Sequence, residues 1–398
     1  MLDIWPALPL IIKASDMYST HKDNIVAALK CSDRVCQIIL VMDWASEWKK
    51  YLGAMQQPFP ELTKLRIRIM SLSREEFTVV PDSFLGGFAP RLEDVELLSI
   101  PFPGLPKLLL PTTHLVRLQL YDIPHSGYIS PDAMVAALST LTSLNVLWLR
   151  FESPESCPDL ETRRLPPSTR SVLPVLTYFS FKGVTEYLED LVTDIDAPQL
   201  NKLSITFFND SVFETPQLIQ FISRTPVSSA LKNAHIALRD DNARVIFRPH
   251  TYASGYVLKV SIICEGLDWQ LSSLEQVCTS YLPFLSTLED VYIHEYPQWQ
   301  PDWKDNIENR VWPELLHPFN AIKNLYISKT IAPRIGPALQ EGRATDVLPA
   351  LENIFLERLE SSGAVQEGIG QFVAARQGSS HPVTISRWEN SEKDKYYK

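Results

Sequence analysis

Large apolar residues recur along the chain at one fixed spacing. Five segments share a pattern of proline, any residue, and then L-x-x-L-x-L, where L is a large apolar residue. The alternation at the end of this pattern is typical of a β-strand that buries one face. These segments span residues 60–67, 90–97, 174–181, 198–205 and 349–356.

The same apolar triplet continues the series where the proline is missing. Its first residue stands at positions 5, 35, 62, 92, 115, 144, 176, 200, 231, 257, 288, 322 and 351, and a weaker copy surrounds Val383 and Ile385. The steps of 23 to 34 residues lie near the upper end of the leucine-rich-repeat period. The series therefore predicts about 13 stacked repeat units.

The segments between these copies predict helices. Ser130 and Thr215 each place a hydroxyl group directly before a proline, as expected for an N-cap followed by the first helical position. Apolar residues with helical spacing occur over residues 132–141, 217–223, 23–29, 186–195 and 365–375. Each unit is too small to bury its own apolar face, so neighbouring units must stack.

This alternation predicts an α/β fold, a leucine-rich-repeat-like solenoid with a horseshoe or arc shape. Its parallel strands should form the concave sheet, and its helices the convex side. No Gly/Ser-rich or charged linker divides the chain, so we expect one domain over residues 1–388 and a polar tail over 389–398. Where standard repeats place Asn or Cys after the strand, this chain has residues such as Met70, Ile100 and Phe208, so we expect no asparagine ladder there.

Composition narrows the class of protein. The chain has 398 residues, of which 45% are hydrophobic and 21% charged, which suits a globular fold. A net charge of -10 argues against a nucleic-acid partner, and no apolar run is long enough for a membrane helix. Five cysteines without framework spacing and no leader segment predict a cytoplasmic or nuclear protein with reduced thiols. We also expect a monomer.

No motif for catalysis or metal binding is present. The sequence has no nucleophile elbow, phosphate-binding glycine loop or zinc-protease motif. The pairs Asp194/Asp196 and Asp240/Asp241 stand beside turns, where Asp is a common capping residue. We therefore expect no enzyme, no cofactor and no metal, and keep a hydrolase with an unrecognised site as the less favoured alternative.

Two close cysteines are the other candidate metal ligands. Cys31 and Cys36 have only His21 nearby, and a structural site needs four ligands. We expect both to be small buried apolar side chains.

The outward side of the predicted strands gathers cations and aromatic rings. It carries eight basic and four acidic residues, although the whole chain has 37 basic and 47 acidic ones. Arg, Tyr and Trp together have the composition of interface hot spots. The candidate partner-binding strip consists of Arg66, Arg117, Tyr121, Trp148, Arg150, Tyr178, Lys182, Lys202, Lys259 and Tyr292. The alternative is an ordinary solvated sheet face; if the strip binds, its partner should be an acidic or phosphorylated protein segment.

Two tryptophans stand in a polar, proline-containing stretch at residues 294–303. Trp299 and Trp303 would be unfavourable in water, so either they fold back onto the solenoid or they form a second partner-binding loop.

Several longer sequence segments are typical of a protein family and not only of a fold. They are WPALPLII (5–12), DRVCQI (33–38), PDSFLGG (81–87), IPFPGLPKLLL (100–110), IPHSGYISP (123–131), EYLEDL (186–191), DWQLSSL (268–274) and IGQFVAAR (369–376). In these segments, which extend from one end of the chain to the other, the chain resembles a group of mushroom-type (basidiomycete) fungal F-box or F-box-like proteins with leucine-rich repeats.

The resemblance implies the substrate receptor of a ubiquitin ligase. In such proteins an N-terminal F-box binds a Skp-type adaptor, and the repeats select the target. Here the first repeat begins near Trp5, which leaves no room for an F-box. The F-box either lies upstream of this chain or has been lost, so a Skp-type adaptor is expected only in the first case. The alternative is an adaptor-free scaffold or a degenerate family member.

Overall fold

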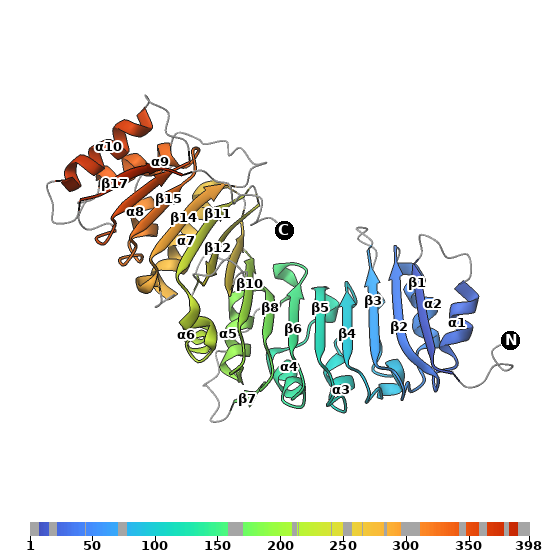
Figure 1. Cartoon of the computed structure of the whole chain (residues 1–398). Coiled ribbons are helices and arrows are strands. Elements are labelled where there is room, and N and C mark those ends of the chain that lie inside the picture. Colours follow the sequence, from blue (N-terminus) through green and yellow to red (C-terminus); the bar gives the residue numbers. More distant parts are fainter. Residues whose placement is uncertain are drawn as a thin grey trace. The chain divides into compact units, whose positions relative to one another are not determined.

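The chain folds into two compact units, each a sheet with helices along one face (Figure 1). The first contains residues 1–201 and 224–226, and the second residues 202–223 and 227–398. The structure is a computed structural model, and it describes residues 8–15, 22–43, 45–70, 78–157, 170–208, 213, 215–239, 241–249, 257–264, 266–281, 285–295, 311–341, 348–357, 364–377 and 382–388. The single domain over 1–388 stays a prediction, and the tail at 389–398 lies outside the described residues.

The strands of the first unit are parallel and follow one another in sequence order. They are β1 (Leu10–Ser15), β2 (Val35–Met42), β3 (Lys64–Ile69), β4 (Asp94–Leu98), β5 (Arg117–Ile123), β6 (Val146–Phe151) and β8 (Tyr178–Gly183). The connections contain α1 (Lys22–Leu29), α2 (Ala45–Ala54), α3 (Leu105–Leu109), α4 (Pro131–Leu138), α5 (Thr185–Thr193) and the 3-10 turns η3 (Phe84–Gly87), η4 (His125–Gly127) and η5 (Pro154–Ser156). A separate small ladder pairs β7 (Ser171–Val172) with β9 (Ile195–Asp196).

The predicted apolar triplets form the core of this unit. Leu62, Leu65 and Ile67 of one copy are buried, and so are the corresponding residues of the next copies. A recurring backbone link joins the copies: the Thr63 carbonyl accepts hydrogen bonds from the amides of Glu93 (2.8 Å) and Asp94 (3.1 Å). In the same way, the Glu93 carbonyl accepts hydrogen bonds from the amides of Val116 and Arg117 in the following copy. Burial and hydrogen bonding thus repeat together, as a solenoid requires.

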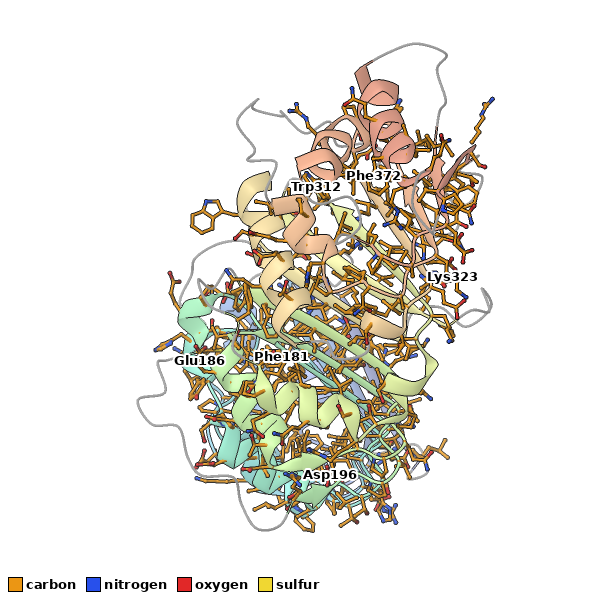
Figure 2. The ribbon with its side chains drawn as sticks, turned by 90° about the vertical axis from the view of Figure 1, so that its left-hand side faces the viewer. Phe181, Glu186, Asp196, Trp312, Lys323 and Phe372 are labelled. Atoms are coloured by element: carbon orange, nitrogen blue, oxygen red, sulfur yellow. The ribbon has the colours of Figure 1, made fainter. Side chains whose placement is uncertain are left out.

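Two predicted helix starts are confirmed. Ser130 Oγ accepts a hydrogen bond from the Ala133 amide (3.3 Å), and Pro131 is the first residue of α4. Helix α6 begins at Pro216, directly after Thr215. Figure 2 shows Phe181 in the interior of the first unit and Glu186, on α5, at its surface.

The first copy was predicted in the wrong place. The triplet beginning at Trp5 would bury Leu8, but Leu8 is 59% exposed, and β1 begins only at Leu10. Ile12 is the buried residue of this strand. Trp5 lies outside the described residues.

The second unit has a reversed block in its sheet. Its strands are β10 (Lys202–Phe208), β11 (Asn233–Leu238), β12 (Asn242–Arg248), β13 (Leu258–Ile263), β14 (Asp290–Glu295), β15 (Asn324–Ile327), β16 (Asn353–Leu356) and β17 (Thr384–Arg387). In space they follow the order β10-β13-β12-β11-β14-β15-β16-β17. Strand β12 is antiparallel to both of its neighbours, whereas the other pairs of this unit are parallel. The sequence series missed β12 and therefore the order of β11 and β13.

Helices cover one face of this sheet as well. They are α6 (Pro216–Ser223), α7 (Leu267–Tyr281), α8 (Val311–Leu316), α9 (Ala332–Glu341) and α10 (Ala364–Gln377), with 3-10 turns η6 (Pro226–Ala230) and η8 (Leu285–Thr287). Trp312 and Phe372 lie on this helical side (Figure 2), and both are buried. The predicted fold class is confirmed: the chain is an α/β, leucine-rich-repeat-like solenoid with mostly parallel strands and helices along one face.

Candidate partner-binding faces

Each unit leaves one face of its sheet without helices, and we call this the open face. The strand register places the candidate strip on these faces but divides it between the two units. Strip residues on the open face of the first unit are Arg66, Arg117, Tyr121, Trp148, Arg150, Tyr178 and Lys182. Those in strands of the second unit are Lys202, Lys259 and Tyr292. Whether these residues bind a partner stays a prediction.

Most cations of the first open face are already paired. The Asp94 carboxylate lies 3.1 Å from Lys64 Nζ, 3.0 Å from an Arg66 guanidinium nitrogen and 3.8 Å from one of Arg117. Glu96, which is buried, pairs with Arg66 at 3.2 Å and also with Arg68. Two acids on β4 thus neutralise four cations on β3 and β5 in part, and the excess of free positive charge is smaller than the sequence count indicates.

A row of aromatic rings crosses the strands β5, β6 and β8. Tyr121, Trp148 and Tyr178 are half-buried, with centroid distances of 5.2 Å for the first pair and 5.3 Å for the second. The Arg150 guanidinium carbon lies 6.0 Å from the Tyr121 centroid and 5.9 Å from that of Trp148, within the range of cation–π attraction. We call these four residues the aromatic row.

Lys182 lies beside this row in an unusual setting. It is directly opposite Arg150 in the register of β6 and β8. Its Nζ is 3.7 Å from Asp122 Oδ1 and donates a hydrogen bond to the Glu152 carbonyl (3.4 Å). Burial lowers the pKa of Lys182. The negative charge of Asp122 opposes this effect, and the positive charge of Arg150 adds to it. Asp122 has a left-handed backbone (φ 46°) at an irregularity of β5, which is uncommon for a residue other than glycine.

The open face of the second unit carries a stack of parallel rings. His235, Tyr292, Tyr326 and Phe355 occupy one register position on β11, β14, β15 and β16. Neighbouring centroids are 4.3, 4.2 and 4.5 Å apart, and the ring planes differ by less than 10°. Trp388 lies against the edges of Tyr292 and Tyr326 at 5.9 and 5.6 Å. Trp388 was not among the predicted site residues.

A ladder of polar side chains runs beside this stack. Asn324 donates to Asp290 Oδ1 (2.7 Å), Asn353 donates to Asn324 (2.9 Å), and Thr384 donates to Asn353 (2.7 Å). When the oxygen and nitrogen of its side-chain amide are exchanged so that both have suitable partners, Asn233 donates a hydrogen bond to Asp290 Oδ2 (2.9 Å). This ladder stands where the strands begin, not where they end. Alignment of the repeat copies would have found it, because Asn233, Asp290, Asn324 and Asn353 hold the same position in each.

The residues considered for catalysis have structural partners. Asp196 pairs with Arg224 (2.7 Å), Asp194 is the C-cap of α5, and Asp241 accepts a hydrogen bond from Asn242. Asp240 lies outside the described residues. In the part of the chain that the structure describes, no three His, Cys, Asp or Glu side chains gather as metal ligands would.

The five cysteines are free thiols, but they differ in burial. Cys157, Cys264 and Cys278 are buried. Burial raises the pKa of the Cys278 thiol to about 12, which suppresses the nucleophilic thiolate. Cys31 and Cys36 are half-exposed, so the prediction that they are buried was wrong.

Trp299 and Trp303 lie outside the described residues, so neither reading of their loop is decided. None of the helices that the structure describes combines the length and the apolar character required to cross a bilayer.

Comparison with known proteins gives structural likeness at low sequence identity. No protein-family model matches the sequence, and no curated protein is similar to it. The chain is similar in structure to the leucine-rich repeat-containing protein LegL7 from Legionella pneumophila, with 11% identity and a TM-score of 0.30, over 92% of this chain and 97% of that one. The strand pairing and burial described above therefore carry the assignment to a leucine-rich-repeat-like fold.

Proposed function

We propose that the chain is a non-catalytic protein-binding module, and that the aromatic row on its first open face is the center of the binding surface. The observation that carries the proposal is the row itself. Two tyrosines, a tryptophan and an arginine lie together on neighbouring strands, half-buried and uncovered by helices. These residue types dominate binding energy at protein interfaces, since they offer large rigid surfaces at little entropic cost.

The family resemblance supports a more specific role as the target-selecting half of an F-box-type receptor. A solenoid provides an extended sheet face on which a target segment can lie. The second candidate is a scaffold that works without an adaptor.

An affinity capture experiment with matched variants tests the proposal. The intact chain, Trp148→Ala and Trp269→Ala are used as baits in a fungal extract, and the retained proteins are compared by mass spectrometry. Trp269 is the control because it is 63% exposed but lies on a helix of the other unit. We expect at least one protein to be retained by the intact chain and Trp269→Ala and lost with Trp148→Ala.

Arg150→Glu provides a check against misfolding. Arg150 is half-exposed, so its reversal should leave the melting temperature unchanged and still weaken capture. Equal capture by all baits would contradict the proposal. Among the retained proteins, a Skp-type adaptor and a cullin would favour the receptor role, and their absence beside another stable partner would favour the scaffold.

A further inference from the structure

We infer that Arg150 and Lys182 form an anion subsite at the end of the aromatic row, which takes the carboxylate of an aspartate or glutamate side chain from a partner's acidic segment. This inference rests on the proposed protein-binding function and names the chemistry of the partner.

The two cations lie in an electrostatically unfavourable position. Arg150 and Lys182 are directly opposed on the parallel strands β6 and β8, and both project from the open face. Like charges opposite one another on neighbouring strands destabilise a sheet. The Lys182 side chain is also only 16% exposed, so its charge has lost much of its hydration. Asp122 and the Glu152 carbonyl offset part of this cost for Lys182, and a bound anion would relieve the remaining repulsion between Lys182 and Arg150.

Arg150 differs from the other arginines of this face in its partners. Arg66, Arg68 and Arg117 each reach a carboxylate of β4. Within the described ranges, no carboxylate oxygen lies within 4.0 Å of the Arg150 guanidinium, which instead lies over the rings of Tyr121 and Trp148. A guanidinium has five N–H donors and binds carboxylates in a two-pronged geometry. The rings hold this group in place before a partner arrives, which lowers the entropic cost of binding.

The net charge of the subsite favours a carboxylate over a phosphate. Arg150 and Lys182 bring two positive charges, and Asp122 offsets one of them at 3.7 Å from Lys182. The exposed Glu152 adds a weaker negative influence on Lys182. The remaining charge is therefore at most about one positive unit, which a carboxylate balances and a phosphate dianion exceeds. The partner segment is acidic, with apolar residues next to its carboxylate to cover the row.

Short fluorescein-labelled peptide pools provide the test. The pools are random except at one central position, which is fixed as Glu, Gln or phosphoserine, and binding to the full chain is followed by fluorescence anisotropy. Glu and Gln have the same shape, so their difference reports charge. We expect the Glu pool to bind about tenfold more tightly than the Gln pool, as one charge-assisted hydrogen bond allows. Arg150→Gln and Lys182→Gln should each bring this ratio close to one.

Arg91→Gln is the matched control. It also removes one positive charge from the first unit, but Arg91 is 61% exposed and pairs with Glu61 just before β4, away from the row. The ratio should therefore persist in this variant. The binding ratio of Lys182→Gln is interpreted only if this variant keeps the melting temperature of the parent. If it does not, Arg150→Gln provides the test, because Arg150 is half-exposed.

The inference is overturned by any of four results. They are an absence of binding by every pool, equal binding of the Glu and Gln pools, a ratio that survives Arg150→Gln, and tighter binding of phosphoserine than of Glu. None of these results removes the protein-binding proposal, which is judged by whether Trp148→Ala loses a captured protein.

Discussion

The indole ring of Trp388 meets the ring of Tyr326 edge-on, with centroids 5.6 Å apart and planes inclined at 69°. Trp388 follows β17, the last described strand, and its amide donates to the Leu356 carbonyl (2.8 Å). Its side chain reaches beyond the neighbouring strand to rings on β15 and β14. One residue therefore ties the final strand to the aromatic stack of the second unit.

Trp388→Ala should loosen this end of the sheet. Removal of the indole takes away two edge-to-face contacts, and we expect a loss of about 1–3 kcal/mol in local stability. Since repeat units contact mainly their neighbours, the loss should be confined to the end of the sheet that Trp388 links, from β14 to β17. Hydrogen exchange measures it: the amides of these strands should exchange faster, and those of β3 and β4 should not change. Uniformly faster exchange across the chain would contradict this account.

Asp94→Asn should destabilise the first unit. The change removes the negative charge that Lys64, Arg66 and Arg117 surround and leaves three cations in mutual repulsion. Because these cations are partly exposed and screened, we expect a loss of about 2 kcal/mol in the free energy of unfolding. Glu61→Gln is the control, since Glu61 and Arg91 form an exposed pair worth at most about 1 kcal/mol. Urea unfolding compares the two variants, and equal losses would contradict the role of Asp94.

His235 should make stability depend on pH. Burial, with additional effects from His294 and Arg248, holds the pKa of His235 well below its usual 6.5. As pH falls below 6.5, the unfolded chain therefore binds a proton that the folded chain does not. The free energy of unfolding should then decrease by up to about 1.4 kcal/mol per pH unit until the folded-state pKa is reached.

Urea unfolding of His235→Phe between pH 7 and 5.5 measures this contribution. Phenylalanine can still stack on Tyr292, so the variant should keep its fold and show a flatter dependence on pH than the parent. The same slope in His235→Phe and the parent would show that His235 does not titrate as described.

Gly86→Ala should be destabilising by about 1–3 kcal/mol. Gly86 has φ 62°, and an added Cβ would lie 2.5 Å from the backbone nitrogen of Pro58. Gly370→Ala is the opposite case, because Gly370 lies inside α10 and nothing is within 4 Å of its added Cβ. It should be stabilising by about 0.5–1 kcal/mol. Thermal unfolding should move the two variants in opposite directions.

The sequence predicted most of the repeat because its signal is local. A triplet such as Leu62, Leu65 and Ile67 indicates which side of a strand is buried. This side does not depend on which strand lies next to it. Strand order carries no such local signal, so β12 and the reversal around it were missed. One clue was present: only three residues separate Leu238 from Asn242, too few for the crossover that parallel strands need. The Arg239 amide donates to the Asn242 carbonyl and closes this turn.

The candidate strip was predicted in position but not in pairing. Residue counts treated Arg66 and Asp94 as separate surface charges, whereas the register of β3 and β4 brings them to 3.0 Å. Arg150 lies over aromatic rings, whereas the other arginines of this face lie beside carboxylates. This difference depends on residues of the neighbouring strands, which no single repeat copy specifies. The contact of Trp388 with Tyr292 also spans several strands and has no sequence signal.

The reversed block limits how this solenoid could be shortened or extended by design. Where strands follow sequence order, as from β2 to β6, one copy can be excised or duplicated and each remaining strand still meets a parallel neighbour. Around β12 this freedom is lost, because deletion of β11 alone would set β14 beside a strand running the opposite way. The β11–β12 hairpin, residues 233–248, therefore has to be removed or transplanted as a whole. Its removal leaves β13 beside β14, and these two strands run in the same direction.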